Sequence, residues 1–159
     1  MGGANNICTD KTGTLTKNQM SVTNLFVEEN MHTHIDKKNI REQTLTILCE
    51  GICINSNALP KITNTTFEHG GNKTECALLE MAFKFGFNYE KYRPSDKIKK
   101  VIPFSSTRKK MTVVYQLEDE VIRIYSKGAP DVLLDRCSEY INNEGMKAKY
   151  YKILLILLD

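Results

Sequence analysis

The chain has 159 residues, of which 41% are hydrophobic and 26% are charged, a composition that predicts a packed globular unit rather than disorder. The net charge is only +3 with acids and bases interspersed, and no aromatic–basic pattern favours nucleic-acid binding. No stretch reaches the roughly 18 consecutive apolar residues of a membrane helix, nothing resembles a signal peptide, and five irregularly spaced cysteines predict reduced, mostly buried thiols in a cytosolic setting.

The most informative stretch is Cys-Thr-Asp-Lys-Thr-Gly-Thr-Leu-Thr, residues 8–16. The apolar pair that precedes Asp10 favours the end of a short buried strand over residues 6–8, and Gly13 allows a sharp turn. Asp10 would then lie at the carboxyl edge of a strand, where open α/β sheets bind ligands. The hydroxyls, lysine and glycine around it suit a phosphate, and a carboxylate that faces a phosphate needs a cation between them. These residues predict an aspartate nucleophile with bound Mg²⁺ that becomes an aspartyl-phosphate.

Residues 10–16 resemble the phosphorylation motif of P-type ATPases, Asp-Lys-Thr-Gly-Thr-Leu-Thr, at every position. A surface turn that spells these letters by chance is the alternative, but it does not account for so long a match. The resemblance implies that Asp10 is phosphorylated, and that Asp10 and the carbonyl of Thr12 hold Mg²⁺. It further implies that Lys11 and Thr14 neutralise and cradle the transferring phosphate.

The segment that follows alternates polar and apolar residues up to position 25, which predicts a half-buried strand. The resemblance implies that residues 1–25 are the N-terminal piece of the phosphorylation domain and a hinge. Only the first strand of that domain would be present among these residues. Residues 26–159 would be the nucleotide-binding domain, truncated at its C-terminal end. Within it, residues 28–40 are polar and predict a loop.

Apolar residues recur at helical spacing from Arg41 to about Ile54, which predicts a helix. Cys49 and Cys53 are four residues apart on it. We interpret this pair as core packing rather than as a metal site, because a cysteine pair on a core helix packs more often than it binds a metal.

Residues 71–79, Gly-Asn-Lys-Thr-Glu-Cys-Ala-Leu-Leu, predict the start of a second helix that runs to Phe85. Asn72 suits the N-cap, and Glu75 suits the returning carboxylate of a capping box. The string also resembles the nucleotide-domain signature of P-type pumps, in which this glutamate contacts the adenine amino group. Both roles stay open, because a fixed helix start holds a carboxylate rigidly.

A lysine-rich connector is expected over residues 90–100, followed by two strands over residues 101–114 that are joined by a basic turn. Residues 112–117 and 121–126 are rich in β-forming residues and are separated by three acidic ones. They predict an antiparallel hairpin.

Phe104 stands close to Arg108, Lys109 and Lys110, which offers an aromatic face for adenine and cations for phosphates. The alternative is a core phenylalanine beside a solvated basic loop, and composition alone favours it. The string Phe-Ser-Ser-x-Arg-Lys-x-Met, however, resembles the family's stretch whose phenylalanine stacks on adenine. Ser106 stands where some pumps have an arginine, so phosphate contacts are expected from Arg108 or Lys109.

Residues 126–131, Ser-Lys-Gly-Ala-Pro-Asp, close a strand and open a helix, with Pro130 in the first turn. Apolar spacing over residues 134–141 extends the predicted helix. Gly128 permits a close approach to backbone, and Lys127 stands at the strand end. The element resembles the family's Lys-Gly-Ala-Pro, whose lysine lies deep in the ATP pocket. The apolar run at 153–158 predicts a core strand or a helix end.

The resemblance covers residues 1–140 and is nearest to the plasma-membrane, calmodulin-regulated calcium pumps. It implies an α/β fold in which an antiparallel sheet is flanked by helices and preceded by the first strand of a haloacid-dehalogenase-like phosphorylation domain. It also implies a cytosolic fragment of an ATP-driven cation pump, with Ca²⁺ the expected ion. In the full-length protein the fragment would bind ATP and Mg²⁺ and accept the γ-phosphate on Asp10. Its partners would be the remaining phosphorylation, actuator and membrane domains of an integral membrane protein.

Two other functions compete with this one. Haloacid-dehalogenase-like phosphatases share the nucleophile but carry a second aspartate two residues later, where this chain has Thr12. The other alternative is a non-catalytic nucleotide-binding module. For the fragment by itself we expect weak ATP binding without turnover, since the family's later catalytic elements are not among these residues.

Overall fold

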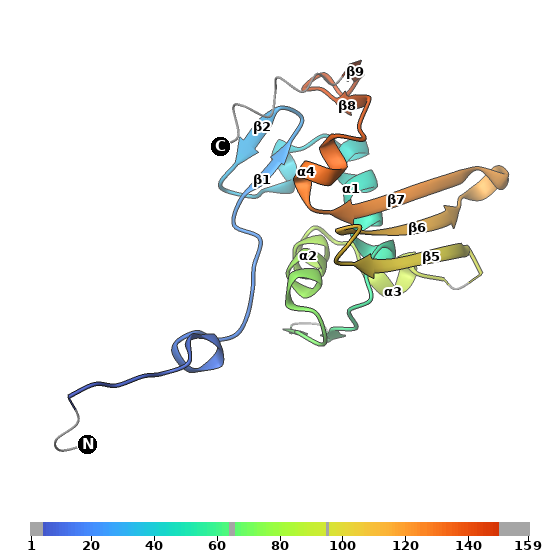
Figure 1. Cartoon of the computed structure of the whole chain (residues 1–159). Coiled ribbons are helices and arrows are strands. Elements are labelled where there is room, and N and C mark those ends of the chain that lie inside the picture. The colour runs from blue at the N-terminus through green and yellow to red at the C-terminus, as the bar shows by residue number, and fades with distance from the viewer. Residues whose placement is uncertain (1–4, 64–65, 95, 150–159) are drawn as a thin grey trace.

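The fold is that of a computed structural model whose described residues are 5–63, 66–94 and 96–149. A three-stranded antiparallel sheet lies on one side of helix α1 (Glu42–Ile54), and helix α2 (Lys73–Lys84) packs on the other (Figure 1). This arrangement confirms the predicted fold class of an antiparallel sheet flanked by helices.

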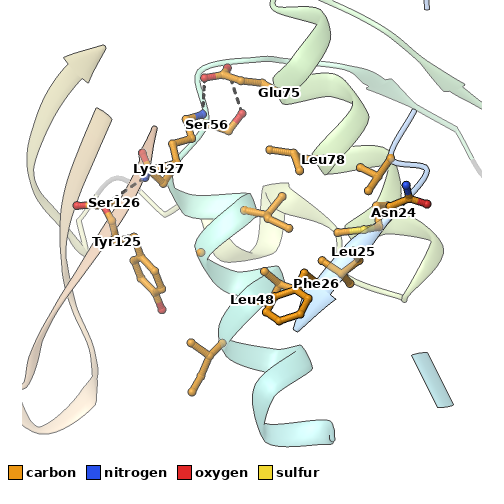
Figure 2. A pocket seen from close by; sticks show the side chains of 16 residues that line it. Asn24, Leu25, Phe26, Leu48, Ser56, Glu75, Leu78, Tyr125, Ser126 and Lys127 are labelled. Atoms are coloured by element: carbon orange, nitrogen blue, oxygen red, sulfur yellow. Dashed lines mark hydrogen bonds and ion pairs between the residues drawn. The ribbon is translucent and has the colours of Figure 1, made fainter. Parts of the chain in front are cut away.

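The sheet has the strand order β5-β6-β7. Its strands are β5 (Ile98–Ser105), β6 (Lys110–Gln116) and β7 (Ile122–Gly128). Both predicted pairs of antiparallel strands are therefore confirmed. Tyr125 on β7 points toward α1 (Figure 2), and a Cβ built on Gly51 of α1 would lie 2.9 Å from its ring. The glycine thus lets the helix approach the sheet closely.

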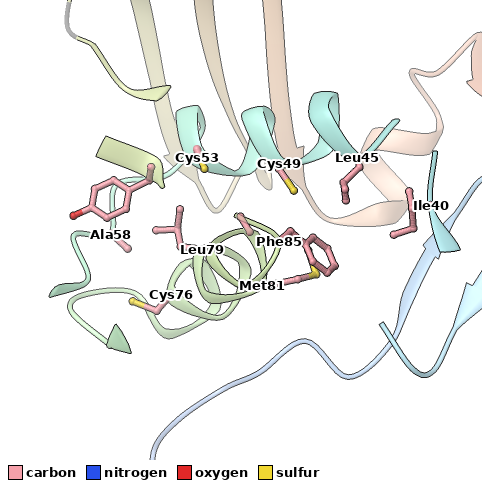
Figure 3. Close-up of a cluster of buried hydrophobic side chains, with 11 residues drawn as sticks. Ile40, Leu45, Cys49, Cys53, Ala58, Cys76, Leu79, Met81 and Phe85 are labelled. Carbon is pink, nitrogen blue, oxygen red and sulfur yellow. The ribbon is translucent and has the colours of Figure 1, made fainter. Parts of the chain in front are cut away.

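The main core lies between α1 and α2 (Figure 3). Leu45, Cys49 and Cys53 share one face of α1 at helical spacing. They pack against buried residues of α2, namely Cys76, Leu79, Met81 and Ala82. The helix predicted up to Ile54 is confirmed, and so is the packing role of its two cysteines. All five cysteines are free thiols, and Cys8 and Cys137 are the exposed ones.

Short elements complete the fold. They are the hairpins β1 (Leu25–Val27) with β2 (Asn30–His32), β3 (Lys61–Ile62) with β4 (Phe67–Glu68) and β8 (Glu139–Ile141) with β9 (Lys147–Lys149), the helices α3 (Tyr89–Tyr92) and α4 (Pro130–Leu134), and the turns η1 (Lys11–Leu15), η2 (Lys37–Asn39) and η3 (Glu118–Glu120). Within the described part of the chain, no helix is long and apolar enough to cross a membrane.

The loop predicted over residues 28–40 is partly wrong, because it contains β2 and η2. Glu28 and Glu29 form the tight turn between β1 and β2, with φ of 53° and 63°. Positive φ is usual for asparagine and glycine in such turns and uncommon for glutamate, so the sequence carries no hairpin signal. The connector expected over residues 90–100 is likewise shortened by the end of α3 and the start of β5.

The helical face predicted over residues 134–141 is also wrong. Helix α4 ends at Leu134, and residues 139–141 pair with residues 147–149. A helix of one turn is marginal by itself, and the hairpin satisfies the same backbone groups with a neighbouring strand. The Tyr140 hydroxyl also donates a hydrogen bond of 2.6 Å to Glu29, which ties this hairpin to β1–β2. The apolar run at 153–158 lies outside the described residues.

The strand predicted over residues 6–8 is not formed, and the segment from residue 5 to about 20 projects away from the body (Figure 1). Ile7 is 72% exposed and Leu15 is 69% exposed. A strand needs hydrogen-bonded neighbours, and within the described ranges no strand pairs with residues 6–8. The half-buried strand predicted up to residue 25 is realised only from Leu25 onward.

Candidate functional site

The site begins with the first turn of α2. The Asn72 side chain accepts a hydrogen bond of 3.1 Å from the backbone N–H of Glu75, so the predicted N-cap is confirmed. The Glu75 carboxylate does not turn back to close a capping box, which is where the prediction fails. It points instead toward the loop that follows α1, because donors gather there.

Four donors surround the Glu75 carboxylate, and Figure 2 shows two of them, the side chains of Ser56 and Lys127. Oε2 accepts from the Ser56 hydroxyl at 3.2 Å and from the backbone N–H groups of Asn57 and Ala58 at 2.9 and 2.8 Å. Oε1 accepts from the Lys127 ammonium at 2.5 Å. A carboxylate oxygen offers about two lone-pair positions, so Oε2 is fully used and Oε1 is held by Lys127.

The Lys127–Glu75 ion pair connects the end of β7 to the start of α2. Lys127 stands opposite Met111 in the sheet, and its side chain is 28% exposed, whereas that of Glu75 is 12% exposed. Burial by itself raises the pKa of Glu75, but the hydrogen bond and charge of Lys127 and two backbone N–H groups outweigh it. The pKa of Glu75 therefore lies below its usual value.

The loop after α1 is itself anchored to the sheet. The buried Asn55 side chain donates to the backbone carbonyls of Met111 at 3.4 Å and Tyr125 at 3.2 Å. This fixes Ser56 and the two N–H groups that follow it. Sequence reasoning did not predict these donors, because the Asn-Ser-Asn stretch also suits an ordinary loop.

A cavity of about 440 Å³ lies beside the ion pair. Its polar side is formed by Glu75, Lys127 and Ser56. The remaining lining is largely apolar, with Leu25 and Phe26 from β1, Leu48 and Ile52 from α1, Leu78 and Met81 from α2, and Tyr125 from β7 (Figure 2). An apolar cavity with a few convergent polar groups is the common form of a small-molecule site.

Phe104 lies at the same end of the sheet as Lys127. Ser105 pairs with Lys110, and Lys110 in turn pairs with Gly128, so these strand ends are level with one another. Phe104 is 62% exposed, so the alternative that it belongs to the core is wrong. An exposed aromatic ring at a strand end is available to stack on a flat ligand.

The other residues predicted for the nucleotide already have contacts within the chain. Arg108 donates to the carbonyl of Pro103 at 2.7 Å, and the ammonium of Lys109 lies 3.8 Å from the Asp131 carboxylate. A Cβ on Gly128 would lie 2.3 Å from the Lys109 carbonyl oxygen. The close approach that Gly128 allows is therefore an approach to the chain's own turn.

The loop around Asp10 is not brought to this site. Asp10, Lys11 and Thr14 are exposed on the projecting N-terminal segment (Figure 1). Gly13 has φ of 85°, as expected for the sharp turn, and the carbonyl of Lys11 accepts from the backbone N–H of Thr16 at 3.2 Å. Within the described ranges, no three acidic, histidine or cysteine side chains gather in a way that could hold a metal ion.

Comparison of the sequence with known proteins identifies its family. The sequence model described as "P-type ATPase, cytoplasmic domain N" matches residues 43–151. The chain belongs to the P-type ATPase family.

Relatives of this P-type ATPase chain include plasma membrane calcium-transporting ATPase 2 from Oreochromis mossambicus, 40% identical over an alignment of 154 residues that covers 91% of the chain and 14% of that protein. Calcium-transporting ATPase PAT1 from Dictyostelium discoideum is 38% identical over an alignment of 148 residues that covers 91% of the chain and 13% of that protein. Plasma membrane calcium-transporting ATPase 3 from Homo sapiens is 37% identical over 154 residues, with the same coverages of 91% and 13%. The chain thus spans about a seventh of the length of these relatives.

Proposed function

We propose that the chain is the ATP-binding part of an ATP-driven calcium pump. The observation that carries this proposal is the Glu75 carboxylate, held rigidly at a helix start, paired with Lys127 and set beside a largely apolar cavity. The names of the relatives, all calcium-transporting ATPases, support Ca²⁺ as the transported ion. The whole protein would be integral to the membrane, with this segment in the cytosol and the phosphorylation, actuator and membrane domains as its partners.

In this proposal the adenine amino group donates to Glu75, and Phe104 stacks on the base. Glu75 offers an ionised carboxylate, and Phe104 offers an exposed ring at the same end of the sheet as Lys127. Lys127 and the basic turn of Arg108 and Lys109 supply positive charge for the phosphates. Lys109 and Arg108 would exchange their present contacts with Asp131 and Pro103 for phosphate oxygens.

Asp10 is the proposed acceptor of the γ-phosphate, with Lys11 and Thr14 beside the transferring group. The Asp10 carboxylate is exposed and therefore accessible to a phosphoryl donor. Together with the carbonyl of Thr12 it offers the oxygen ligands that Mg²⁺ takes alongside substrate phosphates. When bound, Mg²⁺ supplies the positive charge that lets a carboxylate approach a phosphate.

The pump is favoured over a phosphatase of the haloacid-dehalogenase type. The chain has Thr12 where such phosphatases have their second aspartate, so Asp10 has no general base two residues away. A phosphoenzyme that water attacks slowly suits a protein that must change shape before hydrolysis. The match to the P-type cytoplasmic domain supports the same choice.

Titration of this polypeptide with ATP tests the nucleotide site. We expect weak binding without turnover, seen as amide shifts around Glu75, Phe104 and Lys127 in nuclear magnetic resonance spectra. Lys127→Ala should weaken ATP binding by about fivefold or more, since it removes a charged contact. The matched control is Lys37→Ala in the exposed turn η2, which should bind as the wild type does. Unchanged amides at saturating nucleotide would reject the site.

Phosphorylation of the full-length protein tests the role of Asp10. Incubation with γ-labelled ATP should give a labelled protein whose label is released by hydroxylamine, because acyl phosphates react with it and phosphate esters do not. Asp10→Asn should abolish the label, since the amide cannot act as the nucleophile. Label that persists in this variant, or that maps to a serine, contradicts the proposal.

A further inference from the structure

The carboxylate that should receive the base already has four hydrogen-bond donors. Three of them contact Oε2 and are not free to leave, whereas Oε1 is held by the fourth alone. Two are backbone N–H groups, and the third is the hydroxyl of Ser56, which is 5% exposed. The fourth is Lys127, at the end of a flexible side chain that is 28% exposed.

We propose that the Lys127–Glu75 ion pair makes the site select nucleotides that carry a phosphate chain over uncharged nucleosides. Oε2 already has three donors, so a base amine would donate to Oε1 in competition with Lys127, and Lys127 leaves at little cost only if another anion receives it. The inference rests on the proposed nucleotide site and adds a specificity mechanism to it.

The electrostatics of the pair support this exchange. Both side chains are largely withdrawn from water, so separating them without compensation leaves a poorly solvated carboxylate beside a displaced cation. A triphosphate compensates, because its oxygens accept charge-assisted hydrogen bonds from the ammonium. Adenosine presents the same base and ring system but no anion. Its binding therefore carries the full cost of opening the pair.

Three roles for Lys127 predict different results for Lys127→Met, a substitution that keeps the length of the side chain and removes the charge. A lysine that only binds phosphate predicts weaker ATP binding and unchanged adenosine binding. A lysine that contacts the base predicts that both ligands bind more weakly. A lysine that must leave Glu75 predicts weaker ATP binding and stronger adenosine binding, because the opening cost is gone.

The experiment measures adenosine and ATP binding to the polypeptide by amide shifts, for the wild type and for Lys127→Met. We expect adenosine affinity to rise about three- to tenfold and ATP affinity to fall by about tenfold. Lys84→Met breaks a comparable ion pair of α2, with Glu80, away from the cavity, so adenosine affinity should stay within about twofold of the wild type. Adenosine affinity that is unchanged or lower in Lys127→Met overturns the inference.

A measurement on the wild type alone protects the test against a variant that fails to fold. Salt weakens a partly exposed ion pair, so adenosine should bind about twofold more tightly at 0.5 M than at 0.05 M NaCl, while ATP binds more weakly. A flat or falling adenosine affinity counts against the ion-pair mechanism. If the wild type binds neither ligand under any of these conditions, the proposed nucleotide site itself is rejected.

Discussion

Glu75 combines a backbone fixed at the start of a helix with a side chain that is both withdrawn from water and ionised. Its backbone N–H is held by the N-cap Asn72, which fixes the start of α2. Its carboxylate is withdrawn from water, yet it stays ionised because charged and backbone donors surround it. A rigid, ionised and half-buried carboxylate suits ligand recognition, and it also makes folding sensitive to acid.

The acid sensitivity gives a prediction. The pKa of Glu75 is lower in the folded protein than in the unfolded chain, so between these values the unfolded state binds more protons. The stabilisation by Glu75 is present above the unfolded pKa and is lost as the pH falls through the folded pKa. Glu75→Gln should lower the free energy of unfolding at pH 7 by about 1–3 kcal/mol, because donors lose an ionised partner.

Urea denaturation of both proteins from pH 7 down to pH 3 checks this. The acid decline of stability should be shallower in Glu75→Gln than in the wild type. Glu80 is a useful comparison, since its pKa is also lowered, against the effect of burial, by Lys84 and His69. Glu80→Gln should also make the acid decline of stability shallower, and combining both substitutions should make it shallower still. Identical acid slopes in Glu75→Gln and the wild type would contradict the assignment.

At the scale of elements, the end of β7 lies directly against the turn between β5 and β6. The backbone N–H of Ala129 donates to the Lys109 carbonyl at 3.0 Å, directly beside Gly128. No Cβ fits at Gly128, because Cα of Lys110 would lie 2.8 Å from it as well as the Lys109 carbonyl oxygen at 2.3 Å. This contact holds Lys127 and the basic turn at one end of the sheet.

Gly128→Ala should therefore separate the strand end from the turn. We expect a loss of about 1–3 kcal/mol in the free energy of unfolding, measured by chemical denaturation, because backbone rather than a movable side chain occupies the space. The control is Ser126→Ala on the same strand, which removes only an exposed 2.8 Å hydrogen bond to Thr112 and should cost about 1 kcal/mol or less. If Gly128→Ala is as stable as this control, the turn between β5 and β6 moves to accommodate the Cβ at little cost, and the prediction is wrong.

At the scale of the whole molecule, the features that were predictable from the sequence are those with a local period or a strong local signal. The spacing of apolar residues predicted α1, the cap at Asn72 predicted the start of α2, and two β-rich runs around three acidic residues predicted the β6–β7 hairpin. The turn at Glu28 and Glu29 was missed, because glutamate is not a typical residue for its backbone geometry.

The candidate site was predictable only in part, for a different reason. Glu75 and Lys127 were marked by family motifs, but nothing local indicated that they bind each other across 52 positions of sequence. The same holds for Ser56 and the two N–H groups after it, which reach Glu75 from a loop whose sequence predicted no contact with it. The strand predicted before Asp10 failed because a strand is completed by its neighbours in a sheet.

The projecting N-terminal segment has a consequence for how phosphate could reach Asp10. Residues 16–21, which form neither helix nor strand, join the end of η1 to Val22, and Val22 packs against the α1–α2 core. Six residues span at most about 20 Å. A connection of this length keeps the aspartate at an effective concentration of roughly millimolar or more near bound nucleotide. Transfer would then be intramolecular, with a rate that does not change when the protein is diluted.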